Sequence, residues 1–160
     1  MKNVGILYCS GEPNSKFQAD QIRPFLEEMG YSVADYTFAD SNDVAAVTNN
    51  ACDDCDVLYI PTDNTAASNA ELINSVVLDK KIPVVAGEEG LCAGCGCVTL
   101  SISYYDLGTV TGEMAAKILA EGADVSSMEI QYAPFAKKYN ADNCAILGIT
   151  VPEAYEAIAD

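Results

Sequence analysis

Polar residues gather in three short stretches of the sequence, each of which follows an apolar run. The three stretches are Ser10–Ser15, Pro61–Thr65 and Gly87–Gly90. Their hydroxyl, amide and carboxylate groups suit an ammonium group or a hydroxyl donor, which such groups bind through charge-assisted hydrogen bonds. The same carboxylates do not suit a phosphate, and Gly11 alone does not form the glycine pattern that cradles a dinucleotide.

The three stretches therefore favour the recognition of a small molecule. The ligand-binding candidates are Ser10, Glu12, Asn14, Ser15, Asp63, Asn64, Thr65, Glu88 and Glu89. Taken singly, each candidate is better explained as a turn or helix-cap residue, and Asn14 and Asn64 suit capping in particular. Taken together, they are better explained as the ligand-facing edge of one domain.

The sequence carries no recognisable catalytic constellation. It contains no histidine, which excludes Ser-His-Asp triads, Cys-His dyads and histidine-containing zinc sites. Glu88 and Glu89 are adjacent and are expected to diverge on a turn, so they do not form an acid–base pair. Cys9 lies beside Ser10 without a base to activate it. We predict that the protein is not an enzyme and needs no cofactor.

Cysteine is frequent for a chain of 160 residues. The seven cysteines are Cys9, Cys52, Cys55, Cys92, Cys95, Cys97 and Cys144. The CxxC and CxxCxC clusters among them suit a Cys₄ zinc or iron–sulfur site, or local disulfides in an extracellular protein. We favour free, buried thiols and predict no metal site, because the two clusters are expected at opposite ends of the sheet.

Short apolar strands alternate with amphipathic helices along the chain. Strands are expected at Val4–Tyr8, Tyr31–Phe38, Val57–Ile60, Ile82–Ala86 and Val98–Ser103, with two more at Met128–Tyr132 and Phe135–Tyr139. Helices are expected up to Gly30, at Asp43–Ala51, Ala66–Asp79 and Tyr105–Ala120, from Asn140, and from Pro152. The stretch 91–97 is expected to be a loop. This alternation predicts an α/β fold: a three-layer, doubly wound, flavodoxin-like parallel sheet.

The predicted fold explains why the three polar stretches belong together. In an open parallel sheet, ligands bind beyond the carboxyl ends of the strands. All three stretches directly follow expected strands, so we expect them to meet at that edge.

The charge of the chain excludes some classes of partner. The chain carries 24 acidic and 8 basic residues, for a formal net charge of −16. Such a surface repels nucleic acid and anionic lipid, so we predict no nucleic-acid partner. No run of about 18 apolar residues suggests a membrane span, and no signal peptide precedes Val4.

The polar stretches also resemble the motifs of a known family, the substrate-binding proteins of ABC transporters. Segments Val4–Ser15, Tyr59–Thr65, Pro83–Gly90, Ile102–Ala115 and Asn140–Pro152 resemble its "GILYNSSEANS", "YVPTDNT", "PVFAGEEG", "ISYYELGRQTGEMA" and "N…A…LGITIP" motifs. The five motifs keep their order and approximate spacing over nearly the whole chain, which makes the resemblance specific.

The resemblance implies a type I periplasmic-binding-protein fold, in which two lobes close on a solute. Residues 1–160 match only the later, carboxy-terminal lobe. Residues 1–103 form its core, and the helix 105–120 and tail 121–160 are normally shared with an absent amino-terminal lobe. The family's signal and lipid-anchoring cysteine are also absent from this chain. The resemblance implies an extracellular lipoprotein or periplasmic protein that serves an ABC permease.

The family includes lipoproteins thought to carry aromatic amino acids such as tryptophan. The resemblance therefore implies an amino-acid solute, held by the nine candidates named above. Cys9 replaces an asparagine of the family pattern, and the cysteine-rich stretch 92–97 also departs from it. A lone lobe is expected to bind its solute weakly, because half of the contacts are missing. Its helix 105–120 is expected to fold back or to pair with a second copy, as a homodimer or domain swap.

Two other functions remain open from the sequence. The first is a cytosolic, flavodoxin-like redox or regulatory domain that uses the cysteine clusters. The second is the effector-binding lobe of a transcription regulator, which shares the fold.

Overall fold

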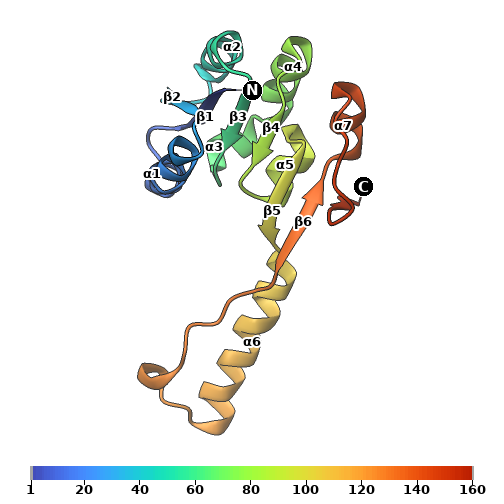
Figure 1. Cartoon of the computed structure of the whole chain (residues 1–160). Coiled ribbons are helices and arrows are strands. Elements are labelled where there is room, and N and C mark those ends of the chain that lie inside the picture. The colour runs from blue at the N-terminus through green and yellow to red at the C-terminus, as the bar shows by residue number, and fades with distance from the viewer. Residues whose placement is uncertain (1, 160) are drawn as a thin grey trace.

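The computed structural model describes residues 2–159 and shows one seven-stranded sheet with helices on both sides (Figure 1). The strands are β1 (Asn3–Cys9), β2 (Ser32–Phe38), β3 (Val57–Ile60), β4 (Val84–Ala86), β5 (Val98–Ile102), β6 (Phe135–Tyr139) and β7 (Glu156–Ala157). The α-helices are α1 (Pro13–Glu28), α2 (Val44–Asp54), α3 (Asn64–Ser68), α4 (Ala70–Lys80), α5 (Glu89–Cys95), α6 (Tyr104–Glu121) and α7 (Ala141–Leu147). A 3₁₀ turn, η1, spans Val125–Ser127.

The strand order is β2-β1-β3-β4-β5-β6-β7, and the first five strands are parallel. Right-handed crossovers place α1, which connects β1 to β2, on one face of the sheet. The chain then moves in the opposite direction, so α2, α4 and α5 lie on the other face. The predicted three-layer, doubly wound α/β class is confirmed. Two strands depart from it, because β6 runs antiparallel to β5 and β7 runs parallel to β6.

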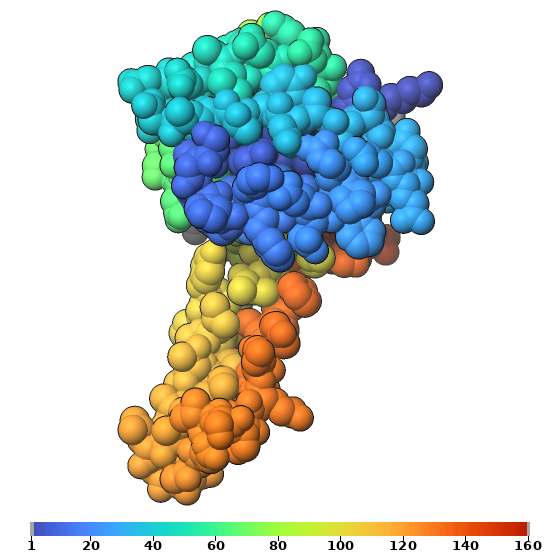
Figure 2. All heavy atoms as spheres, turned by 90° about the vertical axis from the view of Figure 1, so that its left-hand side faces the viewer, coloured from blue at the N-terminus to red at the C-terminus, as the bar shows by residue number. Residues whose placement is uncertain are grey.

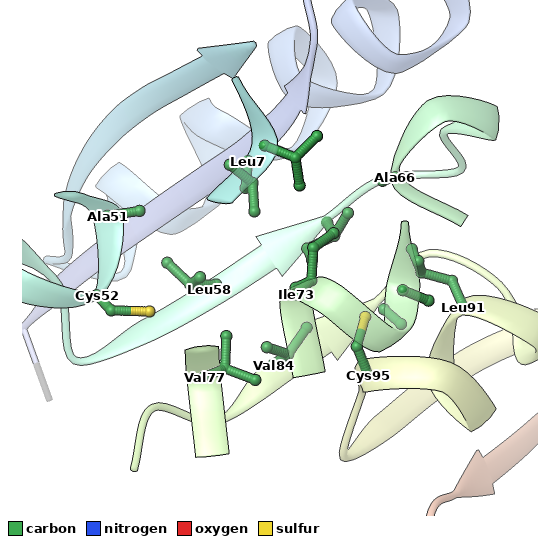
Figure 3. Close-up of a cluster of buried hydrophobic side chains, with 14 of the residues drawn as sticks. Leu7, Ala51, Cys52, Leu58, Ala66, Ile73, Val77, Val84, Leu91 and Cys95 are labelled. Atoms are coloured by element: carbon green, nitrogen blue, oxygen red, sulfur yellow. The ribbon is translucent and has the colours of Figure 1, made fainter. Parts of the chain in front are cut away.

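The main core lies between the sheet and α2, α4 and α5. It is built from the buried, alternate residues of β1, β3 and β4 and from apolar residues of the helices, including Leu7, Leu58, Ile73, Val77, Val84 and Leu91 (Figure 3). A smaller cluster under α1 contains Ile6, Tyr8 and Ala19. The central strand β1 thus buries side chains on both faces, as parallel strands normally do. β4 and β5 bury only the set that faces α4 and α5.

Several sequence expectations are corrected by the structure. The expected loop at 91–97 is helix α5 up to Cys95, because Leu91, Cys92 and Cys95 share a buried side. The expected helix 66–79 is divided at Asn69 into α3 and α4. The expected strand at 128–132 is irregular chain without a strand partner, and no helix begins at Pro152, where a turn leads into β7.

Residues 104–134 leave the sheet altogether and are called the arm below. The arm contains α6, η1 and the returning chain, and Figures 1 and 2 show it extending away from the rest of the molecule. No residue of α6 is buried. Residues 2–103 and 135–159, called the body, contain the sheet. The expected division of the chain between two lobes stays a prediction, but β6 and β7 of the tail belong to this sheet.

Candidate functional site

The carboxyl edge of the sheet carries the loops that follow β1, β3 and β4, and these loops are bonded to one another. The backbone N–H of Cys9 donates to Asp63 Oδ2 at 2.8 Å, which joins the first loop to the second. The backbone N–H of Gly87 donates to the Ile60 carbonyl at 2.7 Å, which joins the third loop, after β4, to the end of β3, where the second loop begins. We call this edge the rim. The three polar stretches meet there, as their positions after the strands indicate.

Glu12 forms the most extensive connection across the rim. Its Oε2 accepts hydrogen bonds from the backbone N–H and the side-chain amide of Asn64, both at 2.9 Å. Its Oε1 accepts from the backbone N–H and hydroxyl of Thr65, both at 2.8 Å. Partial burial alone raises the pKa of this carboxyl, but the four hydrogen bonds outweigh it and lower the pKa to about 2. Glu12 is therefore ionised and fixes the start of α3 against the first loop.

Two other candidates are buried under the rim. Asp63 is 2% exposed, and its Oδ1 caps α3 by accepting the Ala66 N–H at 2.8 Å. Ser15 is fully buried, and its hydroxyl donates to the Thr62 carbonyl at 3.1 Å. The polar atoms of both side chains are thus used within the protein. Their contribution to the site is to hold the second loop in position.

The third loop is organised by the start of α5. Glu88 accepts hydrogen bonds from the backbone N–H groups of Gly90 and Leu91 and so caps the helix. The Glu89 N–H donates to the Ser101 hydroxyl of β5 at 3.2 Å. Among residues 2–159 the Glu89 carboxylate accepts no hydrogen bond, so its charge is available to a ligand.

The remaining candidates lie on the outer surface of the rim. Ser10 and Asn64 are exposed, and Thr65 is half-buried. The Ser10 hydroxyl donates weakly to the Phe38 carbonyl at 3.3 Å, and the exposed Asn14 amide donates to Thr62 at 2.8 Å. The side chains of Asn14 and Asn64 do not cap α1 and α3, although both residues were capping candidates in the sequence. The ligand-binding role of all nine candidates stays a prediction.

Three residues that support the rim were not among the candidates. Gly87 allows close contact between two loops, because a Cβ there would lie 2.6 Å from the Thr62 nitrogen. Gln18 reaches from α1 and accepts the Thr62 N–H at 3.0 Å. Ser101, a buried polar residue of β5, holds the start of α5. A glycine directly after an apolar strand, such as Gly87, could have indicated this close contact from the sequence. Nothing in the sequence indicates the role of Gln18.

The cysteines take no part in the rim apart from Cys9. All seven are free and buried, and no three His, Cys, Asp or Glu side chains within residues 2–159 are grouped to hold a metal ion. Burial raises the pKa of Cys92 and of Cys95 to about 12, so these thiols are not ionised at neutral pH. The clusters do not lie at opposite ends of the sheet as expected. Cys55 lies two residues before β3 and Cys97 directly before β5, and these strands are parallel, so both cysteines lie at the same, amino edge of the sheet.

The fold and the polar rim together define a periplasmic-binding-protein-like lobe. The sequence profile described as "ABC transporter substrate binding protein" matches residues 1–160. The chain therefore belongs to the family of ABC transporter substrate-binding proteins. This membership favours the receptor interpretation over the redox and regulator alternatives. Within residues 2–159, no helix combines the length and apolar character needed to span a membrane.

Similar proteins bind aromatic amino acids. The chain is 32% identical over 129 residues to the tyrosine-binding protein of Clostridioides difficile, a match that covers 81% of this chain and 37% of that protein. It superimposes with a TM-score of 0.81 on the ligand-free, open structure of a Clostridium difficile substrate binding protein with adhesive properties. That structure is 33% identical, and the match covers 98% of this chain and 54% of the other.

A second solved structure contains a ligand. An ABC domain from Streptococcus pneumonia in complex with L-Trp has a TM-score of 0.83 and 28% identity, with coverage of 95% of this chain and 52% of that chain. The chain thus spans about half the length of the solved relatives and less of the curated one.

Proposed function

We propose that the chain is the carboxy-terminal, solute-binding lobe of an ABC importer's receptor and that its solute is an aromatic amino acid. The observation that carries this proposal is the rim: three loops joined by Glu12, Asp63 and Gly87 at the carboxyl edge of the sheet, in a chain that belongs to this family. The relatives that bind tyrosine and L-Trp support the choice of ligand.

The rim side chains suit the two polar ends of an amino acid. Glu89, with its unpaired carboxylate beside the cap Glu88, would bind the ammonium group. Ser10 and Asn14 lie at the start of α1, which has no side-chain cap, and would receive the carboxylate with help from the helix dipole. The aromatic ring would be enclosed mainly by the second lobe, because the rim itself exposes few apolar side chains.

The arm leaves the body at the rim, which supports a cleft at this position. β5 ends and β6 begins at the carboxyl edge, since Ile102 is paired with Phe135. A lobe carried by the arm would therefore face the rim. The protein would act by binding and closure, without catalysis, outside the cytoplasmic membrane or in the periplasm, and would deliver its solute to an ABC permease.

A titration of the isolated chain with L-Trp and L-Tyr tests the solute. The chain contains no tryptophan, so L-Trp fluorescence excited beyond the absorption of the nine tyrosines is free of protein background. We expect a dissociation constant in the millimolar range or weaker, because half of the contacts are absent. Amide NMR shifts should concentrate at Ser10, Asn64 and Glu89. Shifts confined to other regions, or none at saturating ligand, would contradict the proposed solute, and micromolar affinity by calorimetry would contradict the half-cleft.

A matched pair of variants sharpens this test. Glu89→Gln removes the proposed ammonium partner and should weaken binding of L-Trp, whereas Glu113→Gln in the exposed arm should not change it. Tryptamine, which keeps the ammonium group but lacks the carboxylate, should show the same dependence on Glu89. Equal binding by both variants would show that Glu89 does not contact the solute.

A further inference from the structure

Two of the seven cysteines, Cys97 and Cys144, lie beside each other although they are 47 positions apart in the sequence. Cys97 directly precedes β5, and Cys144 lies within α7. The Cys144 thiol donates to the Cys97 carbonyl, with its Sγ 3.4 Å from that oxygen. A hydrogen bond also joins the two thiols. Within residues 2–159, no other two cysteine thiols are joined in this way.

The strand register brings the two cysteines together. β6 runs antiparallel to β5, so it leads into α7 at the amino edge of the sheet, where β5 begins (Figure 1). The Asn140 N–H donates to the Cys97 carbonyl at 2.9 Å, which extends the pairing of the strands by one residue. Cys144 follows one helical turn later, because its N–H donates to the Asn140 carbonyl at 3.1 Å. Residues four positions apart share one side of a helix, so Cys144 lies on the side of α7 that faces Cys97.

Two asparagines hold α7 in this position. The Asn143 amide, in a side chain that is 4% exposed, donates to the Gly96 carbonyl at 3.0 Å and to Asn74 Oδ1 at 2.9 Å. Asn140 caps the helix by accepting the Asn143 N–H at 3.0 Å. These contacts fix α7 against the residue before Cys97. A covalent bond between the two cysteines would therefore join groups that the fold already holds side by side.

The other cysteine clusters are less well placed for a bond of this kind. Cys92 and Cys95 belong to the same short helix, α5, and both are packed into the main core. Cys52 lies in α2 and is also part of that core, while the Cys55 thiol is hydrogen-bonded to a tyrosine hydroxyl at 3.6 Å. The pair between β5 and α7 lies outside the main core cluster, so the sulfurs can approach to the bond length of about 2 Å without disturbing it.

We propose that Cys97 and Cys144 are a modification site: an external disulfide oxidises them to a disulfide as the chain folds, and this bond fastens the returning chain to the body. The loop that it closes contains the whole arm. The two strands that carry the arm are thus tied at the amino edge, opposite the edge where the arm leaves. Structural disulfides persist in oxidising compartments, and a location outside the cytoplasm rests on the proposed function.

The oxidation is a thiol–disulfide exchange, for which oxidised glutathione is the probe. The thiolate of one cysteine attacks the glutathione disulfide, which forms a mixed disulfide and releases one glutathione thiolate. The thiolate of the other cysteine then attacks the protein sulfur of the mixed disulfide and releases the second. Two electrons pass from the cysteine pair to the glutathione disulfide, and the two protons of the cysteine thiols end on the two released glutathione thiols.

Burial determines when the bond forms. Both thiols are 3% exposed, and the structure shows them in the reduced state. Burial raises the pKa of Cys144 to about 11, to which the neighbouring Cys97 thiol contributes, and burial also raises the pKa of Cys97. Because the thiolate is the reactive form, the folded chain should oxidise slowly and the unfolded chain rapidly. The same burial protects the finished bond from reductants.

Oxidative refolding of the 160-residue chain tests the pairing directly. The reduced, denatured chain is refolded with reduced and oxidised glutathione, the remaining thiols are blocked, and peptides are mapped by mass spectrometry without reduction. We expect the peptides of Cys97 and Cys144 to be linked in most molecules. A different main pairing, such as Cys92 with Cys95, or a refolded chain that keeps seven free thiols, would overturn the proposal.

A matched pair of variants measures what the bond does. Reduction of the refolded natural chain should lower its melting temperature by about 10 °C, because the bond closes a long loop. Cys144→Ala should remove this dependence on reductant, whereas Cys52→Ala, at another buried helical cysteine, should keep it. A shift that survives Cys144→Ala, or no shift in the natural chain, would overturn the proposal. The mapping of the natural chain decides the pairing by itself if either variant does not fold.

These measurements are independent of the solute. No amino acid is added, so a failure of L-Trp or L-Tyr to bind leaves the expected linkage unchanged. Conversely, a chain without the linkage could still bind through the rim, which lies at the other edge of the sheet.

Discussion

The body and the arm use similar residues but are stabilised in different ways. In the body, residues such as Leu58 and Ile60 are fully buried between a sheet and its helices. In the arm, α6 has a comparable share of apolar residues and none of them is buried. Within the described residues the arm is held by local hydrogen bonds and caps, whereas the body also gains the free energy of burial. The comparison separates what forms a helix from what stabilises a fold.

Thiol labelling gives the largest expected difference between the two regions. All cysteines lie in the body and are buried, so an alkylating reagent reaches them only after local or global opening. A cysteine introduced in the arm, Ser126→Cys, should react at the rate of a free peptide. We expect body thiols to react more slowly by a factor of about a thousand or more. Site-resolved mass spectrometry measures both rates in one sample, and rapid native labelling of Cys92 or Cys95 would contradict a rigid body.

Truncation of a leucine tests the same contrast through stability. Leu58→Ala creates a cavity in the centre of the body and should lower the free energy of unfolding by about 3 kcal/mol. Leu119→Ala in the arm should change it by less than about 0.5 kcal/mol. Urea denaturation monitored by circular dichroism measures both. Equal effects would mean that α6 is packed against something in solution.

Glycine substitutions sharpen the comparison at the level of the backbone. A methyl group at Gly87 would lie 2.6 Å from the Thr62 nitrogen and 2.7 Å from the Pro61 carbonyl carbon, so Gly87→Ala must separate two rim loops. We expect a loss of about 1–3 kcal/mol in unfolding free energy. Gly112→Ala meets no atom within 4 Å in the arm and should leave stability unchanged or raise it by up to about 1 kcal/mol. Thermal denaturation of the two variants tests whether their changes in stability have opposite signs.

The smallest expected effect concerns Glu12 and depends on pH. Its pKa in the folded protein is about 2, below the ordinary value of 4.5, so its contribution to stability is complete above about pH 4.5 and is lost as the pH falls towards 2. Glu12→Gln should cost about 1 kcal/mol at neutral pH, and the difference from the natural chain should vanish near pH 2. Glu113→Gln in the arm should show no such convergence. Unfolding curves recorded from pH 2 to 7 measure the stability difference between each variant and the natural chain.

Much of the body was predictable from the sequence, because its strands are short apolar runs bounded by polar turns. The carboxyl-edge position of the three polar stretches followed from the same pattern. Two features were not predictable. The first is α5, which contains glycines that disfavour a helix, and the burial of α5 against β4 outweighs that preference. The alternation at 128–132 indicated a strand, but a strand forms only beside a partner, and residues 2–159 provide none.

The candidate site was predictable in position but not in the state of each side chain. Residue types alone could not distinguish Asp63, which is buried and fully hydrogen-bonded, from Glu89, which has a free carboxylate. The difference depends on which donors lie within reach, and those belong to residues far away in the sequence. The same reason explains why Gln18 was missed, since its partner Thr62 is 44 positions away.

The double attachment of the arm determines how force passes through the molecule. Two backbone segments, after Ile102 and before Phe135, leave adjacent paired strands side by side. Twisting such a joint would strain the hydrogen bonds between β5 and β6, so it resists torsion more than a single covalent tether would. Because Ser101 is next to this joint and holds the Glu89 N–H, tension on the arm would be transmitted mechanically to the start of α5.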